Sequence, residues 1–135
     1  MNFALDENQN ELQALATRIF NENVTPDALK AHAATGAPYD ANLWRLLADA
    51  GLLGVTAPEE AGGLGFGMLE FGLLLEAAGR VLAPAPLLPT GIAARLLAAA
   101  GKMDVLGKIA TGEVLVALAL EDEDGDPSTP SLNAT

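Results

Sequence analysis

The sequence predicts an all-α fold, a bundle of about five to six helices followed by a single C-terminal strand. Half of the 135 residues are hydrophobic and only 4% are aromatic, and Ala and Leu dominate, which suits helices packed closely through small side chains. Apolar residues recur at helical spacing in successive segments, and capping residues, glycines and prolines separate these segments. A chain of this length is expected to form one domain with a modest core.

The first two helices are expected over residues 6–24 and 25–36. Asp6, followed three residues later by Gln9, has the pattern of a helix N-cap with its partner, and an apolar face continues from there to Val24. Thr25 starts the second helix, because Thr is a good N-cap and the proline after it suits the first helical position. This helix is expected to end near Gly36.

The third and fourth helices are expected between Asp40 and Gly51 and from Met68 to Leu82. Asp40 is a suitable N-cap, Gly51 is a suitable C-terminal cap, and Trp44 is expected in the core. Five glycines and one proline occupy residues 54–67, and this composition predicts a loop.

Prolines at positions 84, 86 and 89 are expected to separate the fourth helix from a fifth over Thr90–Ala100, and a short sixth helix follows to about Ala110. Val114–Leu120 is the one convincing strand. A single strand leaves its backbone groups unpaired, so it needs a sheet that no other segment supplies. We therefore expect a helical domain over residues 1–113 and the start of a truncated β domain over residues 114–135.

Charge and composition argue against several classes of function. The net charge is −11 and the seven basic residues are scattered, so neither nucleic acid nor an anionic membrane is an expected partner. The chain has no cysteine, which excludes disulfides and thiolate metal sites, and we expect no metal ligand set. Without a recognisable signal peptide, a cytoplasmic location is expected.

Segments along the whole chain resemble one enzyme family. Gly51–Gly65, with the sequence GLLGVTAPEEAGGLG, resembles the GLLG…PEExGGxG signature near the start of flavin-dependent acyl-CoA dehydrogenases. Leu43–Ala48 resembles the LWxxLA part of the helix before it, and Leu75–Arg80 resembles the family's xEExGR helix. Residues 84–89 are similar to a proline-rich turn, and residues 109–121 to the entry of the family's β domain. With the opening helix, six segments in the family's order resemble its N-terminal helical domain.

The resemblance implies that the complete protein removes the α and β hydrogens of an acyl-CoA thioester. FAD would take the hydride, and a carboxylate from a C-terminal domain would take the α proton. It also implies electron-transfer flavoprotein as a partner, and a homo- or hetero-oligomer. No catalytic residue is expected within these 135 residues, so the isolated chain is expected to be inactive and to hold no cofactor.

The resemblance further implies that this domain closes one wall of the acyl pocket. The residues expected to line the acyl chain are Pro84, Ala85, Pro86, Leu87, Leu88, Pro89, Thr90, Ile92 and Ala93. The small side chains among them would leave room for a bulky or branched acyl group.

The flavin-contacting loop departs from the family's pattern. That loop usually reads TExxxGSD, and the residues implied to contact the flavin here are Leu118, Leu120, Gly125 and Asp126. The glycine is kept, but Leu120 and Asp126 replace Thr and Ser, and added carboxylates disfavour a nearby phosphate. Either the correspondence shifts here or the protein binds flavin poorly. The alternative function is therefore a non-catalytic helical interaction module or a partner subunit in a mixed oligomer.

Three polar features have simpler structural explanations. Glu59 and Glu60 are expected in a solvated turn rather than as a catalytic acid pair. His32 has no nucleophile or ligand partner in the pattern, so a surface position is expected. Glu76 is four residues before Arg80, and a salt bridge between them is expected.

Overall fold

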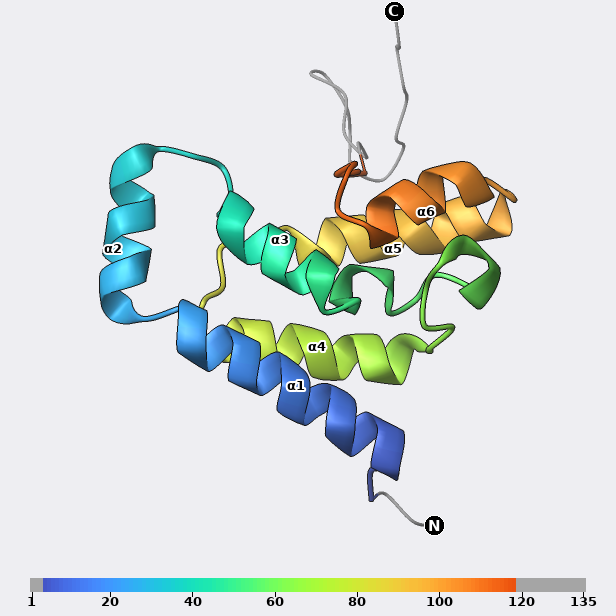
Figure 1. Ribbon diagram of the computed structural model, residues 1–135, viewed down its shortest axis with the longest axis horizontal. Coiled ribbons are helices and arrows are strands. Elements are labelled where there is room, and N and C mark those ends of the chain that lie inside the picture. Colours follow the sequence, from blue (N-terminus) through green and yellow to red (C-terminus); the bar gives the residue numbers. More distant parts are fainter. Residues whose placement is uncertain (1–3, 119–135) are drawn as a thin grey trace, which may run out of the picture.

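The computed structural model describes residues 4–118, and these residues form helices without any strand (Figure 1). The elements are α1 (Glu7–Asn23), α2 (Pro26–Thr35), α3 (Ala41–Asp49), the 3-10 turns η1 (Leu52–Gly54) and η2 (Glu59–Ala61), α4 (Met68–Arg80), α5 (Leu87–Ala99) and α6 (Met103–Ala110). The predicted all-α bundle of five to six helices is confirmed. None of the described helices is long and apolar enough to cross a membrane.

The first three predicted helix starts are confirmed by their capping hydrogen bonds. The backbone N–H of Gln9 donates to Asp6 Oδ1 at 2.8 Å, and that of Asp6 donates to Gln9 Oε1 at 3.0 Å. Thr25 Oγ1 accepts from the N–H of Ala28, the third residue of α2, and Asp40 Oδ1 accepts from N–H groups in the first turn of α3. Gly51 has a left-handed φ of 73° just after α3, a conformation that glycine adopts without steric cost.

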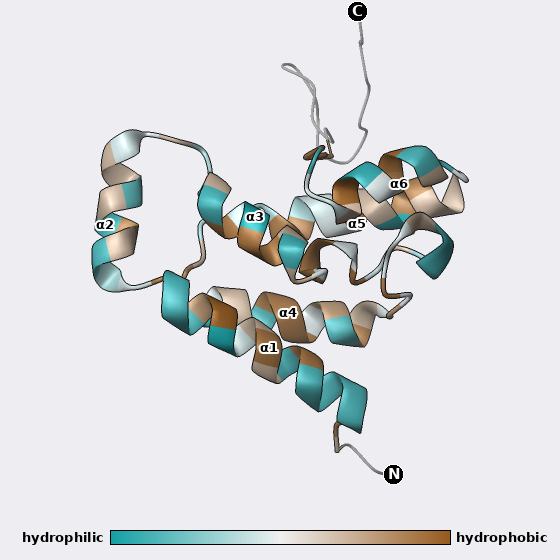
Figure 2. Cartoon of the chain, viewed as in Figure 1, coloured by the Kyte–Doolittle hydropathy of each residue, from teal (hydrophilic) through white to brown (hydrophobic). Residues whose placement is uncertain are grey.

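The helices enclose one main core and a smaller second cluster. α1 and α4 lie side by side and start at the same end of the molecule (Figure 1). α3 lies above this pair in the view and contacts η1 and α1, and α5 packs with α6. In Figure 2 hydrophobic residues lie where α1 meets α4, and the exposed N-terminal end of α1 is hydrophilic. The largest fully buried side chains are Phe20, Leu47, Leu52, Val55, Leu74, Leu106 and Ile109.

α2 differs from the other helices because none of its residues is buried. It stands apart from the bundle at one side of the molecule (Figure 1). Only Leu29 packs against the main core, and it is partly buried. The second cluster lies at the other side, where Leu106 and Ile109 of α6 meet Ala94 of α5 and two alanines of the 54–67 loop.

The loop between η1 and α4 folds back on itself through backbone hydrogen bonds. The N–H of Leu64 donates to the carbonyl of Gly54 and the N–H of Phe66 donates to that of Val55, both at 2.9 Å. A side chain at Gly63 would overlap the backbone carbonyl of Ala57, so only glycine fits there. Gly63, in the segment that resembles the family signature, therefore has a structural role. The prediction of a plain loop over residues 54–67 missed the 3-10 turn η2.

The predicted boundary between the fourth and fifth helices is wrong. α5 begins at Leu87 rather than Thr90, so Pro89 lies in its first turn. The first turn tolerates proline because its N–H groups have no partner within the helix. α4 ends at Arg80 instead of Leu82, and Leu82 adopts a left-handed φ of 55° while remaining 77% exposed. That conformation at a helix end is usually occupied by glycine.

The predicted strand Val114–Leu120 is not found in its described part. Residues 114–118 form no regular element, and residues 119 and 120 lie outside the described residues. A strand needs a second strand to pair with, and residues 4–118 contain none. The sequence pattern was that of a strand, but the partner that would stabilise it is not part of the described chain.

Candidate functional site

The residues expected to line an acyl chain fall on the α4–α5 connection and on α5. Pro84, Ala85 and Pro86 are half-buried in the connection. The N–H of Asp40 donates to the carbonyl of Pro84 at 2.8 Å, which attaches this connection to the start of α3. The remaining six residues lie on α5.

The six residues on α5 lie in two different environments. Leu87, Thr90 and Ala93 are buried in the domain's own core. Leu88 is 52% exposed, and Pro89 and Ile92 are half-buried. A binding partner outside this domain could touch only the second group, because side chains three and four residues apart share a face of a helix.

The outer face of α5 carries an apolar stripe formed by Leu88, Ile92 and Leu96, which are spaced four residues apart. We call these three residues the α5 stripe. Leu96 is 56% exposed, and the sequence analysis missed it, although its distance of eight residues from Leu88 was a usable signal. Of the residues in α5, only Arg95 is charged. A helix that is apolar on all sides is typical of one that is buried in a larger structure.

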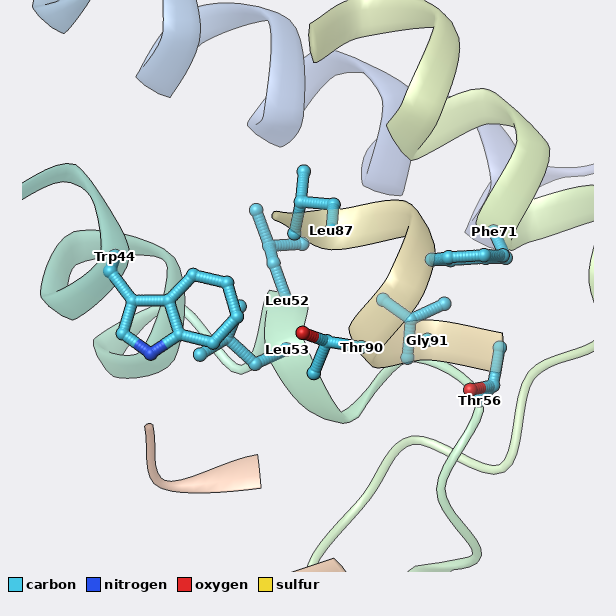
Figure 3. A pocket seen from close by; sticks show the side chains of 9 residues that line it. Trp44, Leu52, Leu53, Thr56, Phe71, Leu87, Thr90 and Gly91 are labelled. Carbon is cyan, nitrogen blue, oxygen red and sulfur yellow. The ribbon is translucent and has the colours of Figure 1, made fainter. Parts of the chain in front are cut away.

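Behind α5, on the side away from the stripe, lies a small cavity (Figure 3). Its volume is about 10 Å³, and its wall includes Leu52, Leu53, Phe71 and Thr90. Figure 3 shows the Thr90 hydroxyl oxygen pointing from α5 toward the η1 segment, and the ring of Phe71 beside Gly91. The inner face of α5 is thus packed against this domain, with little free volume.

The two largest of the hollows found elsewhere on the described surface lie at the ends of α3. One of about 510 Å³ lies between the end of α3, η2 and α6, and its charged residues are Asp49, Asp104, Lys108 and Glu113. The other, of about 460 Å³, lies between α2 and the start of α3, and it includes His32 and Tyr39. Within residues 4–118, no group of His, Cys, Asp and Glu is arranged to hold a metal ion.

The described residues do not fit a flavin. Of the four residues implied for the flavin contact, only Leu118 is described, and it is half-buried; Leu120, Gly125 and Asp126 lie outside the described residues. The larger hollow presents three carboxylates and one ammonium group, an arrangement that repels a diphosphate. No step of a flavin reaction can therefore be derived from this part of the chain.

The expected simple roles of the other polar residues agree with the structure in most respects. Glu59 and Glu60 are exposed in η2. Glu76 Oε1 pairs with Arg80 at 2.6 Å on the surface, as predicted. His32 is half-buried rather than freely exposed, since it lines the hollow beside α2.

A hydrogen-bonded link between α1 and α4 was missed by the sequence analysis. Gln9 Nε2 donates to Glu70 Oε1 at 2.7 Å, and Glu70 Oε2 accepts from the N–H of Gly67 at 2.9 Å. These bonds favour the carboxylate, so the Gln9 amide first, and the backbone N–H groups with it, hold the pKa of Glu70 below its ordinary value of 4.5. Because the two residues are 61 positions apart, no local pattern could have connected them.

Comparison with known proteins gives a consistent family match. The family model for the acyl-CoA dehydrogenase N-terminal domain matches residues 6–113. The chain is 33% identical over 120 residues to acyl-CoA dehydrogenase IpdE2 of Mycobacterium tuberculosis, covering 87% of this chain and 38% of that protein. It is 31% identical over 134 residues to the mitochondrial isovaleryl-CoA dehydrogenase of Solanum tuberosum, covering 94% and 32% of the two chains.

Comparison with solved structures gives relatives of the same kind as the sequence comparison. A variant of the Tcur3481-Tcur3483 steroid ACAD superposes with a TM-score of 0.85 at 42% identity, covering 92% of this chain and 36% of that one. The ChsE4-ChsE5 complex from Mycobacterium tuberculosis superposes with a TM-score of 0.82 at 34% identity, covering 93% and 36%. The chain therefore spans about a third of the length of the relatives that it matches.

Proposed function

Because this chain belongs to the acyl-CoA dehydrogenase family and carries that family's N-terminal domain, we propose that the complete protein is an acyl-CoA dehydrogenase. The reaction would remove the α and β hydrogens of an acyl-CoA thioester. The family match over residues 6–113, together with the TM-score of 0.85, supports this proposal. FAD is the proposed cofactor and electron-transfer flavoprotein the proposed electron acceptor, and the groups that hold FAD would lie outside the described residues.

The proposed domain division follows the same reasoning. Residues 1–113 would form the helical domain, and residues 114–135 would begin a β domain. In support, the family match ends at residue 113, and the last described helix, α6, ends at Ala110. The cytoplasmic location expected from the sequence stays a prediction.

We propose that this domain contributes one apolar wall of the acyl pocket and no catalytic group. The proposed wall consists of Leu88, Pro89 and Ile92 of α5 with the half-buried Pro84–Pro86 connection. Leu87, Thr90 and Ala93 would instead support this wall from behind, because they are buried in the domain's own core. Burial of apolar surface against a substrate stabilises the complex by about 25 cal/mol per Å².

The proposed substrate is an acyl-CoA with a bulky acyl group, either branched or polycyclic. The names of similar proteins support this class, since one is an isovaleryl-CoA dehydrogenase and another a steroid ACAD. The partly exposed α5 stripe offers an extended apolar surface rather than a narrow slot, which suits a wide hydrocarbon better than a straight one.

A partner subunit in a mixed oligomer is the second candidate function. One observation favours it: one of the superposable structures is described as a complex of two differently named chains. In that case the complete protein would bind a second subunit and would show activity only in the complex.

The experiment is an oxidation assay with the complete protein, following reduction of an electron-accepting dye. We expect turnover of a steroid CoA thioester or isovaleryl-CoA, with weaker turnover of a straight-chain acyl-CoA. A flavin absorption spectrum of the purified protein tests the cofactor in the same sample. The enzyme proposal fails if no acyl-CoA is oxidised either alone or with co-expressed subunits, and activity that appears only with a second subunit favours the partner function.

Substitutions in the proposed wall test the role of this domain. Ile92→Ala and Leu88→Ala are expected to raise KM for the bulky substrate about tenfold or less, because each removes about 1–1.5 kcal/mol of apolar contact. Leu69→Ala, at a leucine of α4 whose exposure is similar to that of Leu88, is the matched control and should leave KM unchanged. Equal effects of all three substitutions would contradict the assignment of the wall to α5.

A further inference from the structure

α2 is attached to the bundle more weakly than any other helix of residues 4–118. None of its ten residues is buried, whereas each of the other five helices has at least three buried residues. Leu29 is the residue of α2 that packs against the main core, and its side chain is only half-buried. Figure 1 shows α2 apart from the other helices. Because helices in proteins are stabilised mainly by packing an apolar face, α2 lacks most of that stabilisation.

Polar contacts do not replace the missing apolar packing of α2. A hollow of about 460 Å³ lies between this helix and the start of α3, and Ala28 and His32 are among the residues that line it. The side-chain hydrogen bonds of Thr25 and Thr35 stay within residues 25–37. Among the residues that the structure describes, no recorded hydrogen bond or salt bridge joins α2 to another helix.

Both ends of α2, in contrast, are fixed to the bundle. Before the helix, Val24 is 8% exposed and its N–H donates to the carbonyl of Phe20 at 2.8 Å. After the helix, Asp40 caps α3 with its side chain and donates its own N–H to the carbonyl of Pro84 at 2.8 Å. α2 is therefore a segment that is held at residues 24 and 40 and weakly held between them.

The local sequence of α2 gives it only marginal stability. The helix has ten residues, and isolated helices shorter than about 12–15 residues are marginal in water. Thr25 and Gly36 cap its two ends, but caps add little to a helix without tertiary packing. Length alone does not decide the difference, because α6 has only eight residues and still buries Leu106 and Ile109.

We propose that α2 is a strap that opens independently of the rest of the domain. Opening breaks the half-buried contact of Leu29 and the hydrogen bonds within α2, while α1, α3 and α4 stay packed. The bonds of Val24 and Asp40 limit the opening to the residues between them. The strap does not depend on the reaction proposed for the complete protein.

The main test is amide hydrogen exchange of the complete protein, followed by mass spectrometry of its peptides. After correction for intrinsic rates, we expect the amides of residues 30–35 to exchange at least about tenfold faster than those of α6, because local opening exposes only weakly packed segments. α6 is the matched control, since it is the shorter helix but is fixed by buried residues. Exchange of α2 that is as slow as that of α6 overturns the proposal.

Two leucine substitutions show whether α2 opens on its own. Leu29→Ala should accelerate exchange in α2 about three- to tenfold, because it removes the apolar contact that holds the helix closed. Leu75→Ala, at a leucine of α4 that is also half-buried against the main core, is the matched control and should leave exchange in α2 unchanged. If both substitutions accelerate it equally, α2 opens only together with the bundle, which contradicts the proposal.

Trypsin cleavage of the unchanged protein gives a second measurement that needs no variant. Lys30 lies in α2 and Arg45 in α3, and both side chains are exposed, so the two sites differ in how firmly their helix is packed. A protease cuts within a helix only after the segment opens, so we expect the bond after Lys30 to be cut about tenfold faster or more. Cleavage after Arg45 that is as fast as cleavage after Lys30, or faster, overturns the proposal.

Discussion

Gly91 is the residue on which the close contact between α4 and α5 depends. A side chain at this position would overlap the ring of Phe71, which is itself buried in the main core. Gly91 is buried, and its φ is in the ordinary range, so the requirement is for space and not for an unusual backbone conformation. The same argument applies at Gly63, where the obstacle is a backbone carbonyl rather than a side chain.

We predict that Gly91→Ala lowers the free energy of unfolding by about 1–3 kcal/mol, because the added methyl group forces Phe71 or the helix to move. Urea unfolding measures this change. Gly72→Ala is the matched control: Gly72 lies on the exposed side of α4 with no atom near its missing side chain, and Ala there should stabilise the protein by about 0.5–1 kcal/mol. If both substitutions change stability in the same direction, the contact with Phe71 does not determine the effect of Gly91→Ala.

At the scale of elements, the pair formed by α1 and α4 is held at one end by polar groups. The capping hydrogen bonds of Asp6 orient Gln9, and Gln9 in turn donates to Glu70, whose other oxygen caps the start of α4. Further along the two helices, the contact is apolar, with Ala16 and Phe20 of α1 buried in the main core. The polar link therefore sets the register of the two helices, while the apolar contact supplies most of the stabilisation.

We predict that Glu70→Gln lowers the free energy of unfolding by about 1 kcal/mol at neutral pH, because it removes a charged cap from the start of α4. The pKa of Glu70 is lowered by folding, so its contribution is present above pH 4.5 and is lost as the pH falls through the lower, folded-state value. The difference between wild type and variant should therefore shrink in acid. Unfolding measured across this pH range checks the prediction.

Glu76→Gln is the control on the same helix. Glu76 forms an exposed salt bridge with Arg80, and exposed pairs of this kind contribute only about 0.3–0.5 kcal/mol. A difference between wild type and Glu70→Gln that stays constant from neutral pH to well below 4.5 would contradict the role assigned to the Glu70 carboxylate.

At the scale of the whole molecule, the main electrostatic fact is the excess of negative charge. The chain has eighteen acidic and seven basic residues. Among the described residues, the one recorded salt bridge joins Glu76 to Arg80. The other charged side chains of residues 4–118 are exposed or half-buried, and most of them are acidic, so like charges repel one another across the surface of the folded state.

We predict that added salt stabilises the chain by screening this repulsion. Raising NaCl from about 0.01 M to about 0.15 M shortens the screening length from about 30 Å to about 8 Å. The melting temperature is expected to rise by about 2–4 °C, which corresponds to about 1 kcal/mol. KCl should give the same shift, since screening does not distinguish the two cations. A melting temperature that is independent of salt, or that falls with it, would show that repulsion does not limit stability.

The sequence by itself determined the class of the fold and most of its helix starts. Asp6, Thr25 and Asp40 could be identified as caps because capping depends on residues within one turn of each other. The family resemblance was visible for a related reason. Gly63 is required by a close backbone contact, and Gly62 and Gly65 have a left-handed φ, so these requirements leave a fixed local pattern of glycines.

Only the tertiary structure decided which residues of α5 face outward. Leu87 and Leu88 are identical and adjacent, yet one is buried and the other is half exposed, and an almost wholly apolar helix has no polar face to indicate its orientation. The same holds for the Gln9–Glu70 link and the Thr90 cavity, since both depend on segments that are distant in the chain. Local sequence patterns reflect interactions within a single helical turn. Which side chains are buried, and which residues they bond to, is decided only when the helices pack together.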